Sequence, residues 1–369
     1  MKKVITVIVI SVFTIFTIFA IRSQANKEIE GEDDGYVEIH SLKNWPWRGI
    51  TIVTHSNIED VTEEAIGHLA NDGVNFVRLR LSIREGKYPI EWSLAKKKSK
   101  VFQDASQIIN WCNDNGIVVL ISHSSFPIEK SLGIKQTDAA FWGNKKLLNN
   151  SIVFAKEIVQ NFDHFDNVIG YEFFAEPVIS ENKTSKVPKN WNTHFSNLLS
   201  VIREVSNKYV VYTPGPWGGP KGYHAMERPI LDDKILYNFH FYQPHKYTHQ
   251  KIKGKQETYN YPDFIGLRNI NKKFIENQVE IAANWAQQNK VPMFVGEFSV
   301  TDKAPDKIAY LTDLLETLEK NELSYAYFSF NGWKGWSYPF ESYSDTLKNE
   351  HPTLTLLKEY WSKNKDNVD

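Results

Sequence analysis

Eight short apolar runs recur along this chain, and stretches with helical periodicity lie between them. The runs are continuously apolar and rich in β-branched and aromatic residues, which is typical of parallel strands buried on both faces of a sheet. The predicted strands are Arg48–Val53, Val74–Leu81, Ile117–His123, Val168–Phe174, Tyr209–Thr213, Ile235–Tyr242, Met293–Phe298 and Tyr325–Phe330. The predicted helices include Thr62–Gly73, Gln103–Gly116, Phe274–Asn289 and a final packing helix within residues 352–364. Eight such units that close on themselves predict an α/β fold, a single-domain (β/α)8 TIM barrel over residues 45–369.

The composition supports a large buried core and gives no support for nucleic acid as a partner. Of the 369 residues, 41% are hydrophobic, and the formal net charge is −1, so no basic surface for a polyanion is indicated. Aromatic residues make up 14% of the chain. We expect most of them in the core, but aromatic rings also line grooves that hold the apolar faces of sugars.

The N-terminus has the pattern of an export signal. Lys2 and Lys3 precede an uncharged apolar run from Val4 to Ile21, and small residues follow at 23–25. The run also has roughly the 18–20 residues that span a bilayer, so cleavage and an uncleaved membrane anchor both stay open. We therefore predict a signal peptide or signal anchor over residues 1–25, a charged linker over residues 26–44, and a folded domain that is secreted or extracytoplasmic.

Polar residues gather at the carboxyl ends of the predicted strands, where TIM barrels carry their functional sites. They are Arg78, Arg80, His123, Glu176, Trp217, His240, Tyr242, Glu297, Asn331, Trp333 and Trp336. Glu176 and Glu297 follow the fourth and seventh strands, so their carboxylates can face each other across the barrel mouth. A strand-end acid on its own is usually a salt-bridged structural residue. Two acids that flank a cleft are the equipment for glycosidic bond cleavage, because one protonates the leaving oxygen while the other attacks or activates water.

Six segments at these strand ends resemble motifs of glycoside hydrolase family 5, the cellulase family, and the resemblance as a whole spans roughly residues 47–343. The segments are GVNFVRL (73–79), VVLISH (118–123), IGYEFFAEP (169–177), NFHFYQPHKYTHQ (238–250), VGEFSV (295–300) and FSFNGWKGWSY (328–338). Each motif alone is weak to moderate, whereas six in this order and at these strand ends are specific. The resemblance implies a barrel glycosidase that retains anomeric configuration, with carboxyl groups about 5–5.5 Å apart.

The resemblance also implies a role for each matched residue near the nucleophile. Glu297 is expected to attack the anomeric carbon and form a glycosyl-enzyme. Arg78 is expected to hold Glu297 ionised, and Tyr242 to donate a hydrogen bond to it.

On the opposite side, Glu176 is expected to act as the acid/base. His240 is then expected to orient or charge Glu176, and His123 to contact sugar hydroxyls. His249, on the loop after the sixth strand, stays open between a binding and a structural role.

Among the aromatic residues, Trp333 is the favoured stacking residue for a sugar, because Phe328 stands where many relatives have the tryptophan. Trp217 and Trp336 stay open between platforms at the rim of the cleft and loop packing. Arg80 is predicted to be a structural ion-pair partner rather than a site residue.

The implied partner is a β-linked polysaccharide or oligosaccharide, and a cellulose-like β-1,4-glucan is favoured over mannan, xyloglucan or mixed-linkage glucan. We expect a monomer that contacts a membrane only through an uncleaved anchor. No cluster of His, Asp and Glu has the spacing of a catalytic metal site, and no glycine-rich phosphate loop follows a strand. Neither a metal nor another cofactor is therefore expected.

The chain departs from the family signature at Ala175, because the signature has Asn directly before the acid/base. That asparagine donates to the 2-hydroxyl of the sugar, and one lost donor of this kind costs about 2–4 kcal/mol of transition-state stabilisation. Ala175 predicts low activity, a compensating donor, or a sugar that differs at C2. It also leaves a second function open, a non-catalytic glycan-binding protein on the same barrel, although both glutamates and their supporting residues favour a hydrolase.

Overall fold

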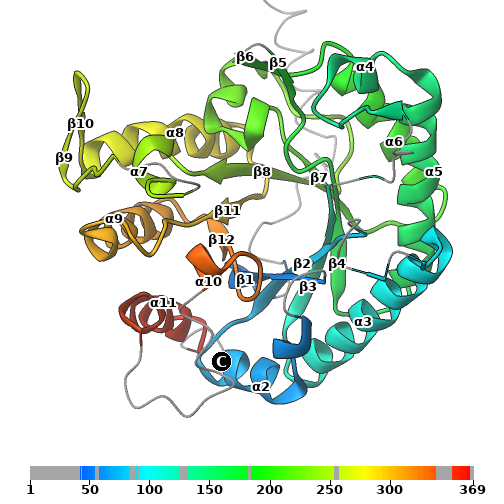
Figure 1. Ribbon diagram of the computed structural model, residues 1–369, viewed down its shortest axis with the longest axis horizontal. Coiled ribbons are helices and arrows are strands. Elements are labelled where there is room, and N and C mark those ends of the chain that lie inside the picture. The colour runs from blue at the N-terminus through cyan, green and yellow to red at the C-terminus, as the bar shows by residue number, and fades with distance from the viewer. Residues whose placement is uncertain are drawn as a thin grey trace, which may run out of the picture. The chain divides into compact units, whose positions relative to one another are not determined.

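The described part of the chain is a closed parallel barrel. The computed structural model describes residues 42, 44–54, 58–83, 88–89, 91–124, 126, 132–181, 184–252, 257–337 and 351–365. Eight strands pair in the ring order β1-β12-β11-β8-β7-β4-β3-β2, as Figure 1 shows. They are β1 (Arg48–Val53), β2 (Phe76–Leu81), β3 (Val118–His123), β4 (Val168–Phe173), β7 (Tyr209–Tyr212), β8 (Ile235–Phe241), β11 (Met293–Phe298) and β12 (Ser324–Tyr327). The predicted (β/α)8 fold is confirmed, with strand ends displaced by a few residues.

Helices surround the barrel (Figure 1). The longer ones are α2 (Glu63–Asn71), α3 (Leu94–Asp114), α5 (Lys145–Phe162), α6 (Trp191–Arg203), α8 (Lys272–Asn289), α9 (Lys307–Lys320) and α11 (Pro352–Ser362). Shorter helices are η2 (Ile58–Asp60), α4 (Ala139–Trp142), η4 (Pro216–Gly218), η5 (Pro220–Ala225), α7 (His245–Thr248) and α10 (Lys334–Ser337). Two hairpins, β5–β6 (Ile179–Glu181 and Thr184–Lys186) and β9–β10 (Asp263–Ile265 and Arg268–Ile270), stand outside the barrel. These hairpins were not predicted.

Capping side chains fix where several helices begin. Thr62 Oγ1 accepts a hydrogen bond from the amide of Ala65 at 3.1 Å, and so starts α2. Ser93 Oγ does the same for α3, accepting from the amide of Lys96 at 3.2 Å. Such caps satisfy amides that have no partner within the helix. Helix α3 therefore begins well before the predicted Gln103, because its first turns are lysine-rich and carry no apolar periodicity.

The core has two layers on either side of the strands. Inside the barrel, Trp47 stacks on Phe76 with ring centroids 5.2 Å apart, and Phe76 meets Phe294 edge-on at 6.1 Å. Outside, the second face of each strand packs against the helices. The inner layer fills the amino-terminal half of the barrel. Polar side chains inside the barrel therefore lie towards the carboxyl ends of the strands.

Among the described residues, no helix is long and apolar enough to cross a membrane. The predicted export segment, residues 1–25, lies outside the described residues, as does the linker over 26–44 except for Leu42 and Asn44. Both remain predictions.

Candidate active site

Glu297 lies at a bulge in β11, and its neighbour Gly296 makes the bulge possible. The register between β11 and β8 shifts between Val295 and Glu297. At this point the amide of Gly296 donates to Asn238 Oδ1 at 2.7 Å, and a Cβ on Gly296 would lie only 2.6 Å from that oxygen. A bulge re-aims the side chain that follows it, and here that side chain is Glu297.

Arg78, from β2, joins Glu297 to a second buried acid. Its guanidinium donates from Nη1 to Glu297 Oε1 at 2.9 Å and from Nε to Glu172 Oε2 at 2.8 Å. Glu172, from β4, also accepts from Ser122 Oγ at 2.5 Å and from Asn238 Nδ2 at 3.1 Å. The buried guanidinium is thus held rigidly between two carboxylates, one of which faces the cavity described below.

The charges around Glu297 keep it ionised. Burial alone would raise the pKa of Glu297, but the charges of His240 and Arg78 outweigh burial and lower that pKa to about 2. The other carboxylate oxygen, Oε2, accepts from the hydroxyl of Tyr242 at 3.2 Å. Burial and the neighbouring Glu297 raise the pKa of Tyr242 well above its ordinary value, so this hydroxyl stays a donor. The geometry therefore presents an ionised, oriented carboxylate.

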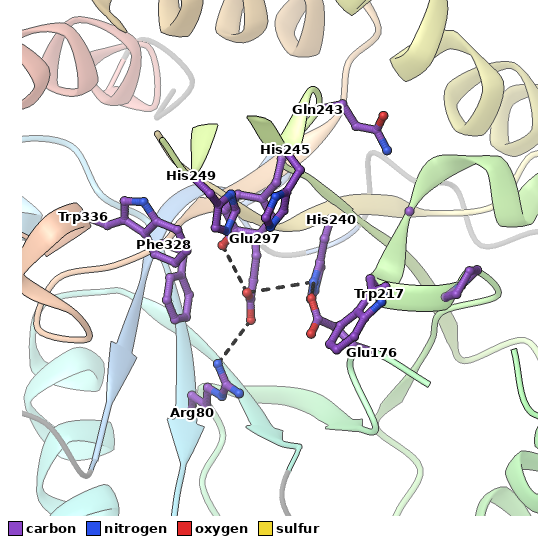
Figure 2. Close-up of a pocket in the computed structure, with 13 residues that line it drawn as sticks. Arg80, Glu176, Trp217, His240, Gln243, His245, His249, Glu297, Phe328 and Trp336 are labelled. Atoms are coloured by element: carbon purple, nitrogen blue, oxygen red, sulfur yellow. Dashed lines mark hydrogen bonds and ion pairs between the residues drawn. The ribbon is translucent and has the colours of Figure 1, made fainter. Parts of the chain in front are cut away.

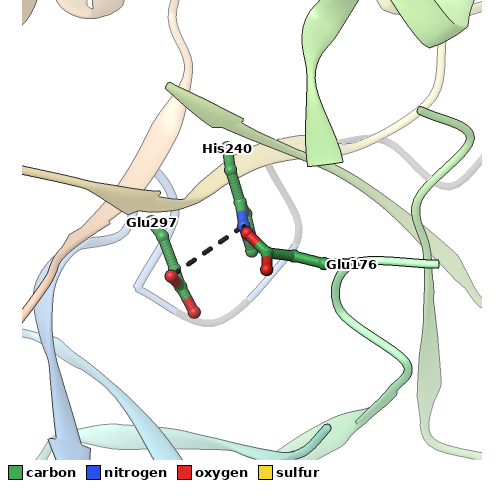
Figure 3. Close-up of side chains that lie close together, drawn as sticks. All are labelled: Glu176, His240 and Glu297. Atoms are coloured by element: carbon green, nitrogen blue, oxygen red, sulfur yellow. Dashed lines mark hydrogen bonds and ion pairs between the residues drawn. The ribbon is translucent and has the colours of Figure 1, made fainter. Parts of the chain in front are cut away.

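Glu176 follows β4 and is held by His240 from β8. His240 Nδ1 lies 2.9 Å from Glu176 Oε1 and 3.9 Å from Glu297 Oε2. Burial acts to lower the pKa of His240, yet Glu297 and Glu176 raise it above its ordinary value. The three side chains converge in Figure 3, where one oxygen of each acid and the imidazole nitrogen lie within 4.8 Å of one another.

These groups open into a cavity of about 610 Å³ at the strand ends (Figure 2). Both glutamates line it, as do aromatic residues from several loops, namely Trp217, Tyr242, Phe328 and Trp336. Such a combination of apolar walls and a few converging polar groups is typical of a ligand site. A polar ring with one apolar face, such as a sugar, fits this lining.

The family model for Cellulase (glycosyl hydrolase family 5) matches residues 39–334. The chain belongs to glycosyl hydrolase family 5. Endoglucanase C of Acetivibrio thermocellus is 23% identical over 324 residues, which cover 78% of this chain and 88% of the relative. Cellodextrinase A of Ruminococcus flavefaciens is 23% identical over 279 residues, 72% of this chain and 76% of the relative. The predicted family resemblance is confirmed, and the protein is a β-glycoside hydrolase by family.

Solved structures of the same family share the barrel. Endoglucanase Cel5A from Thermotoga maritima superposes with a TM-score of 0.66 at 20% identity, covering 87% of this chain and 99% of that one. The same enzyme in complex with mannotriose gives a TM-score of 0.64 at 19% identity, covering 86% and 98%. At this identity the likeness shows the fold.

Of the three predicted tryptophans, Trp217 and Trp336 line the cavity of this family 5 barrel and Trp333 does not. Trp336 stacks on Tyr242 with centroids 5.4 Å apart, and Phe328 meets Trp336 edge-on at 5.8 Å. Trp333, the favoured stacking residue, is 42% exposed and is not among the residues that line the cavity. Phe328 and Trp336 line the cavity on this side instead. Trp217 lines the opposite wall.

A hydrogen bond holds Trp217 at the rim. Its Nε1 donates to Ser185 Oγ, on the β5–β6 hairpin, at 2.8 Å. The indole is 45% exposed although its edge is fixed in this way. Next to it, a Cβ on Gly218 would lie 2.8 Å from Cγ of His240, so the Trp217 turn also packs against the imidazole beside Glu176.

Arg80 is a site residue as well as an ion-pair partner. Its Nη1 lies 3.5 Å from Glu297 Oε1, as the predicted structural role requires. The side chain also lines the cavity (Figure 2), and its Cζ lies 5.7 Å from the centroid of the Phe328 ring. The prediction that Arg80 stands outside the site is therefore wrong, because the residues of β2 alternate in direction and Arg80 ends on the cavity side above Arg78.

His123 takes a different place from the one predicted. Ser122 points into the barrel, where it contacts Glu172, so the next residue of β3 points outward. The His123 ring is fully buried and packs against Phe126 and Phe154, with centroids 5.1 and 5.2 Å away. It is not among the residues lining the cavity, so its position does not support the predicted contact with sugar hydroxyls.

The loop after β8 supplies further lining residues that the sequence reasoning left open or missed. His249 lines the cavity, and its ring stacks on that of His245 with centroids 3.8 Å apart. Gln243 lines it too. Their common signal was the polar run QPHKYTHQ, residues 243–250, directly after the sixth strand.

Glu172 is the main residue that the sequence reasoning missed. An ionisable residue inside the otherwise apolar run VIGYEFF was its signal, since such a residue in a barrel strand needs a buried partner. The partner is Arg78, so the arginine has two acids to bridge rather than one.

Ala175 lies in the turn that delivers Glu176. The preceding residue, Phe174, has φ of 59°, a left-handed conformation that is uncommon for a residue with a side chain. Its ring is held by Phe126 and Trp142, with centroids at 4.5 and 5.3 Å. The turn is therefore fixed by packing, while Ala175 itself is 1% exposed and offers only a methyl group.

Glu176, His240 and Glu297 are also the described residues that could hold a metal ion. Imidazole nitrogen ligates a metal only in its unprotonated form. The raised pKa of His240 and the guanidiniums beside Glu297 favour proton transfer over cation binding at this place.

Proposed function

We propose that this protein is a retaining β-glycoside hydrolase that cleaves β-1,4-linked glucan by double displacement. The observation that carries the proposal is the close approach of the two acids, since one oxygen of Glu176 and one oxygen of Glu297 lie within 4.8 Å of each other. Retaining glycosidases have carboxyl groups about 5–5.5 Å apart, whereas inverting enzymes need about 6.5–9.5 Å to admit a water.

In the first step, Glu297 attacks the anomeric carbon as the bond to the leaving oxygen breaks. Glu176 gives its proton to that oxygen, and a glycosyl ester forms on Glu297. The lowered pKa of Glu297 supplies the ionised nucleophile, and Tyr242 and Arg78 orient it.

In the second step, Glu176, now ionised, takes a proton from water as the water attacks the same carbon. The ester bond breaks and Glu297 leaves as a carboxylate, so the configuration is retained overall. The hydrogen bond between His240 Nδ1 and Glu176 Oε1, at 2.9 Å, keeps the acid aimed at the glycosidic oxygen.

The names of the relatives support a glucan substrate. They are endoglucanases and a cellodextrinase, and Thermotoga maritima Cel5A has been captured with cellobiose and with mannotriose. Cellulose-like chains are the favoured substrate, with mannan as the nearest rival. The aromatic walls Trp217, Phe328 and Trp336 supply faces on which successive pyranose rings stack.

The test compares wild type with Glu297→Gln and Glu176→Gln on cello-oligosaccharides, manno-oligosaccharides and an activated aryl β-cellobioside. We expect Glu297→Gln to lose at least about 10³-fold in kcat on every substrate, because no nucleophile remains. Glu176→Gln should lose less on the aryl substrate, whose leaving group needs no proton. Glu227→Gln, at an exposed acid that is not among the residues lining the cavity, is the matched control.

A 2-deoxy-2-fluoro cellobioside with a good leaving group tests the covalent step. It should label the peptide that contains Glu297, as detected by mass spectrometry, and leave Glu297→Gln unlabelled. Equal release of reducing ends by wild type and Glu297→Gln would overturn the hydrolase proposal.

Ala175 supports one second candidate, a glycan-binding barrel without turnover. That function predicts binding of cello-oligosaccharides by calorimetry together with no product from wild type over long incubation. Product formation that depends on Glu297 excludes it.

A further inference from the structure

The lining of the cavity is unevenly distributed around the barrel. Of its described lining residues, only Arg80 and Glu176 come from the first four strands and their loops, and all the others lie between Pro216 and Trp336. A sugar that rests on Phe328 and Trp336 with its anomeric carbon at Glu297 therefore has one edge towards β2–β4. Of the two described lining residues on that edge, Arg80 has side-chain N–H donors and Glu176 has none.

Glu297 does not need Arg80 to be held in place. Arg78 already donates to the same oxygen, Oε1, at 2.9 Å, while the Nη1 of Arg80 lies at 3.5 Å, beyond the usual N–H···O range of about 2.7–3.2 Å. A guanidinium has five N–H donors in a rigid fork. The guanidinium of Arg80 faces the cavity, and the Arg80 side chain is 23% exposed. It therefore has N–H donors that the ion pair with Glu297 does not use.

C2 is bonded to the carbon that Glu297 attacks, so its hydroxyl comes close to the Glu297 carboxylate when substrate is bound. Arg80 approaches the same carboxylate, at Oε1, and its donors are therefore within reach of that hydroxyl. Hydrogen bonds to this hydroxyl strengthen as the oxocarbenium-like transition state develops. Ala175, buried and without a donor, cannot make this contact.

We propose that Arg80 donates a hydrogen bond to the 2-hydroxyl of the sugar that Glu297 attacks, and that it supplies the contact which Ala175 lacks. This inference rests on the proposed hydrolase function. It makes Arg80 a substrate-binding residue of the cleavage subsite and assigns the chain a preference for sugars that bear a free oxygen at C2.

The test measures kcat/KM for wild type and Arg80→Met on an aryl β-cellobioside and on its analogue deoxygenated at C2 of the sugar next to the aryl group. We expect Arg80→Met to lose on the order of 10- to 100-fold on the parent substrate, the range of one charge-assisted hydrogen bond, and less than about 3-fold on the deoxy analogue. Arg268→Met, an exposed arginine on the β9–β10 hairpin, controls for loss of a positive charge. Adding Ala175→Asn to Arg80→Met should restore part of the lost activity on the parent substrate only.

Equal losses on both substrates would overturn the proposal. The acid limb of the pH–rate profile is compared between wild type and Arg80→Met on both substrates. If the variant shifts this limb to higher pH by the same amount on both, Arg80 acts only on the ionisation of Glu297. Arg80→Lys, which keeps the charge with a shorter side chain, provides the same comparison if Arg80→Met does not fold. Failure of the proposed function is seen separately, as wild-type turnover no greater than that of Glu297→Gln. In that case the role of Arg80 is tested by calorimetry, which measures the affinities for cellobiose and 2-deoxycellobiose. If the ratio of these two affinities is the same in wild type and Arg80→Met, the proposal is contradicted.

Discussion

At the scale of single residues, the charge of Glu297 depends on its neighbours, and this dependence has a measurable effect on stability. The pKa of Glu297 lies at about 2 in the folded state, below its ordinary value of 4.5. Ionised Glu297 therefore stabilises the fold fully above about pH 4.5, and this contribution disappears as the pH falls towards 2.

We predict that Glu297→Gln lowers the free energy of unfolding by about 1.5–3 kcal/mol at pH 7, because a charged hydrogen bond to Arg78 is lost. The difference from wild type should shrink steadily between pH 4.5 and 3. Urea unfolding at these pH values measures it. A difference that stays constant with pH would show that Glu297 has no depressed pKa.

The two exposed tryptophans give a second prediction at this scale. Trp217→Ala should raise KM for cello-oligosaccharides by about 3- to 10-fold with kcat nearly unchanged, because a stacking surface contributes about 0.5–1.5 kcal/mol to binding of substrate and transition state alike. Ser185→Ala, which removes only the hydrogen bond to the indole, should have a smaller effect in the same direction. Trp333→Ala, outside the cavity lining, should change KM less than 2-fold. The opposite ranking of the two tryptophans would restore the stacking role to Trp333.

At the scale of elements, the bulge in β11 decides where the side chain of Glu297 points. Gly296→Ala places a methyl group 2.6 Å from Asn238 Oδ1, so either the bulge or Asn238 must move. We predict a loss of at least about 10²-fold in kcat, since a displacement of about 1 Å costs this much in a catalytic geometry. Gly67→Ala, on helix α2, is the matched control because its nearest neighbour, Asn115 Oδ1, is 3.9 Å away. Near-wild-type kcat in Gly296→Ala would mean that the bulge does not position Glu297.

The elements themselves were largely predictable from the sequence, and the orientation of some side chains was not. Apolar runs locate the strands because a parallel strand is buried on both faces, and this property leaves a continuous signal. The same property hides which residues face the inside of the barrel and which face the helices. His123 was therefore expected at the cavity, although its ring packs on the helix side of the strand. The alternation along β2 places Arg78 and Arg80 on the same face, so their shared approach to Glu297 was a signal that the prediction for Arg80 did not use.

Loop residues were harder to predict than strand residues. The positions of Trp217, Phe328 and Trp336 depend on turns whose geometry is set by distant partners, such as Ser185 for Trp217. Motif order located both glutamates, because it ties each of them to the end of a strand.

At the scale of the whole molecule, Glu172 connects strands from around the ring. Through Arg78 it joins β2, β4 and β11, and through Ser122 and Asn238 it reaches β3 and β8. Glu172→Gln leaves a buried guanidinium with only one acid. We predict a loss of about 3–5 kcal/mol in the free energy of unfolding, the range for breaking a buried ion pair by removing one partner.

Glu157→Gln is the control for this prediction. Glu157 pairs with Lys98 on the surface, with 38% of its side chain exposed, so its replacement should cost at most about 1 kcal/mol. Thermal unfolding of both variants at pH 7 makes the comparison. Equal shifts in Tm would contradict a stabilising role for the buried network.

The barrel closes between its first and last strands. β1 pairs with β12, the amide of Trp47 donates to Ser324 Oγ at 2.7 Å, and Asn331 bonds both backbone groups of Val53 at 2.8 and 2.9 Å. Further along, Asn364 donates to the carbonyl of Gly73 at 2.7 Å. A nascent chain therefore cannot complete its ring until β12, Asn331 and Asn364 have emerged from the ribosome. Closure of the barrel, and with it the placing of Glu297 between its neighbours, has to wait for segments that are translated after β11.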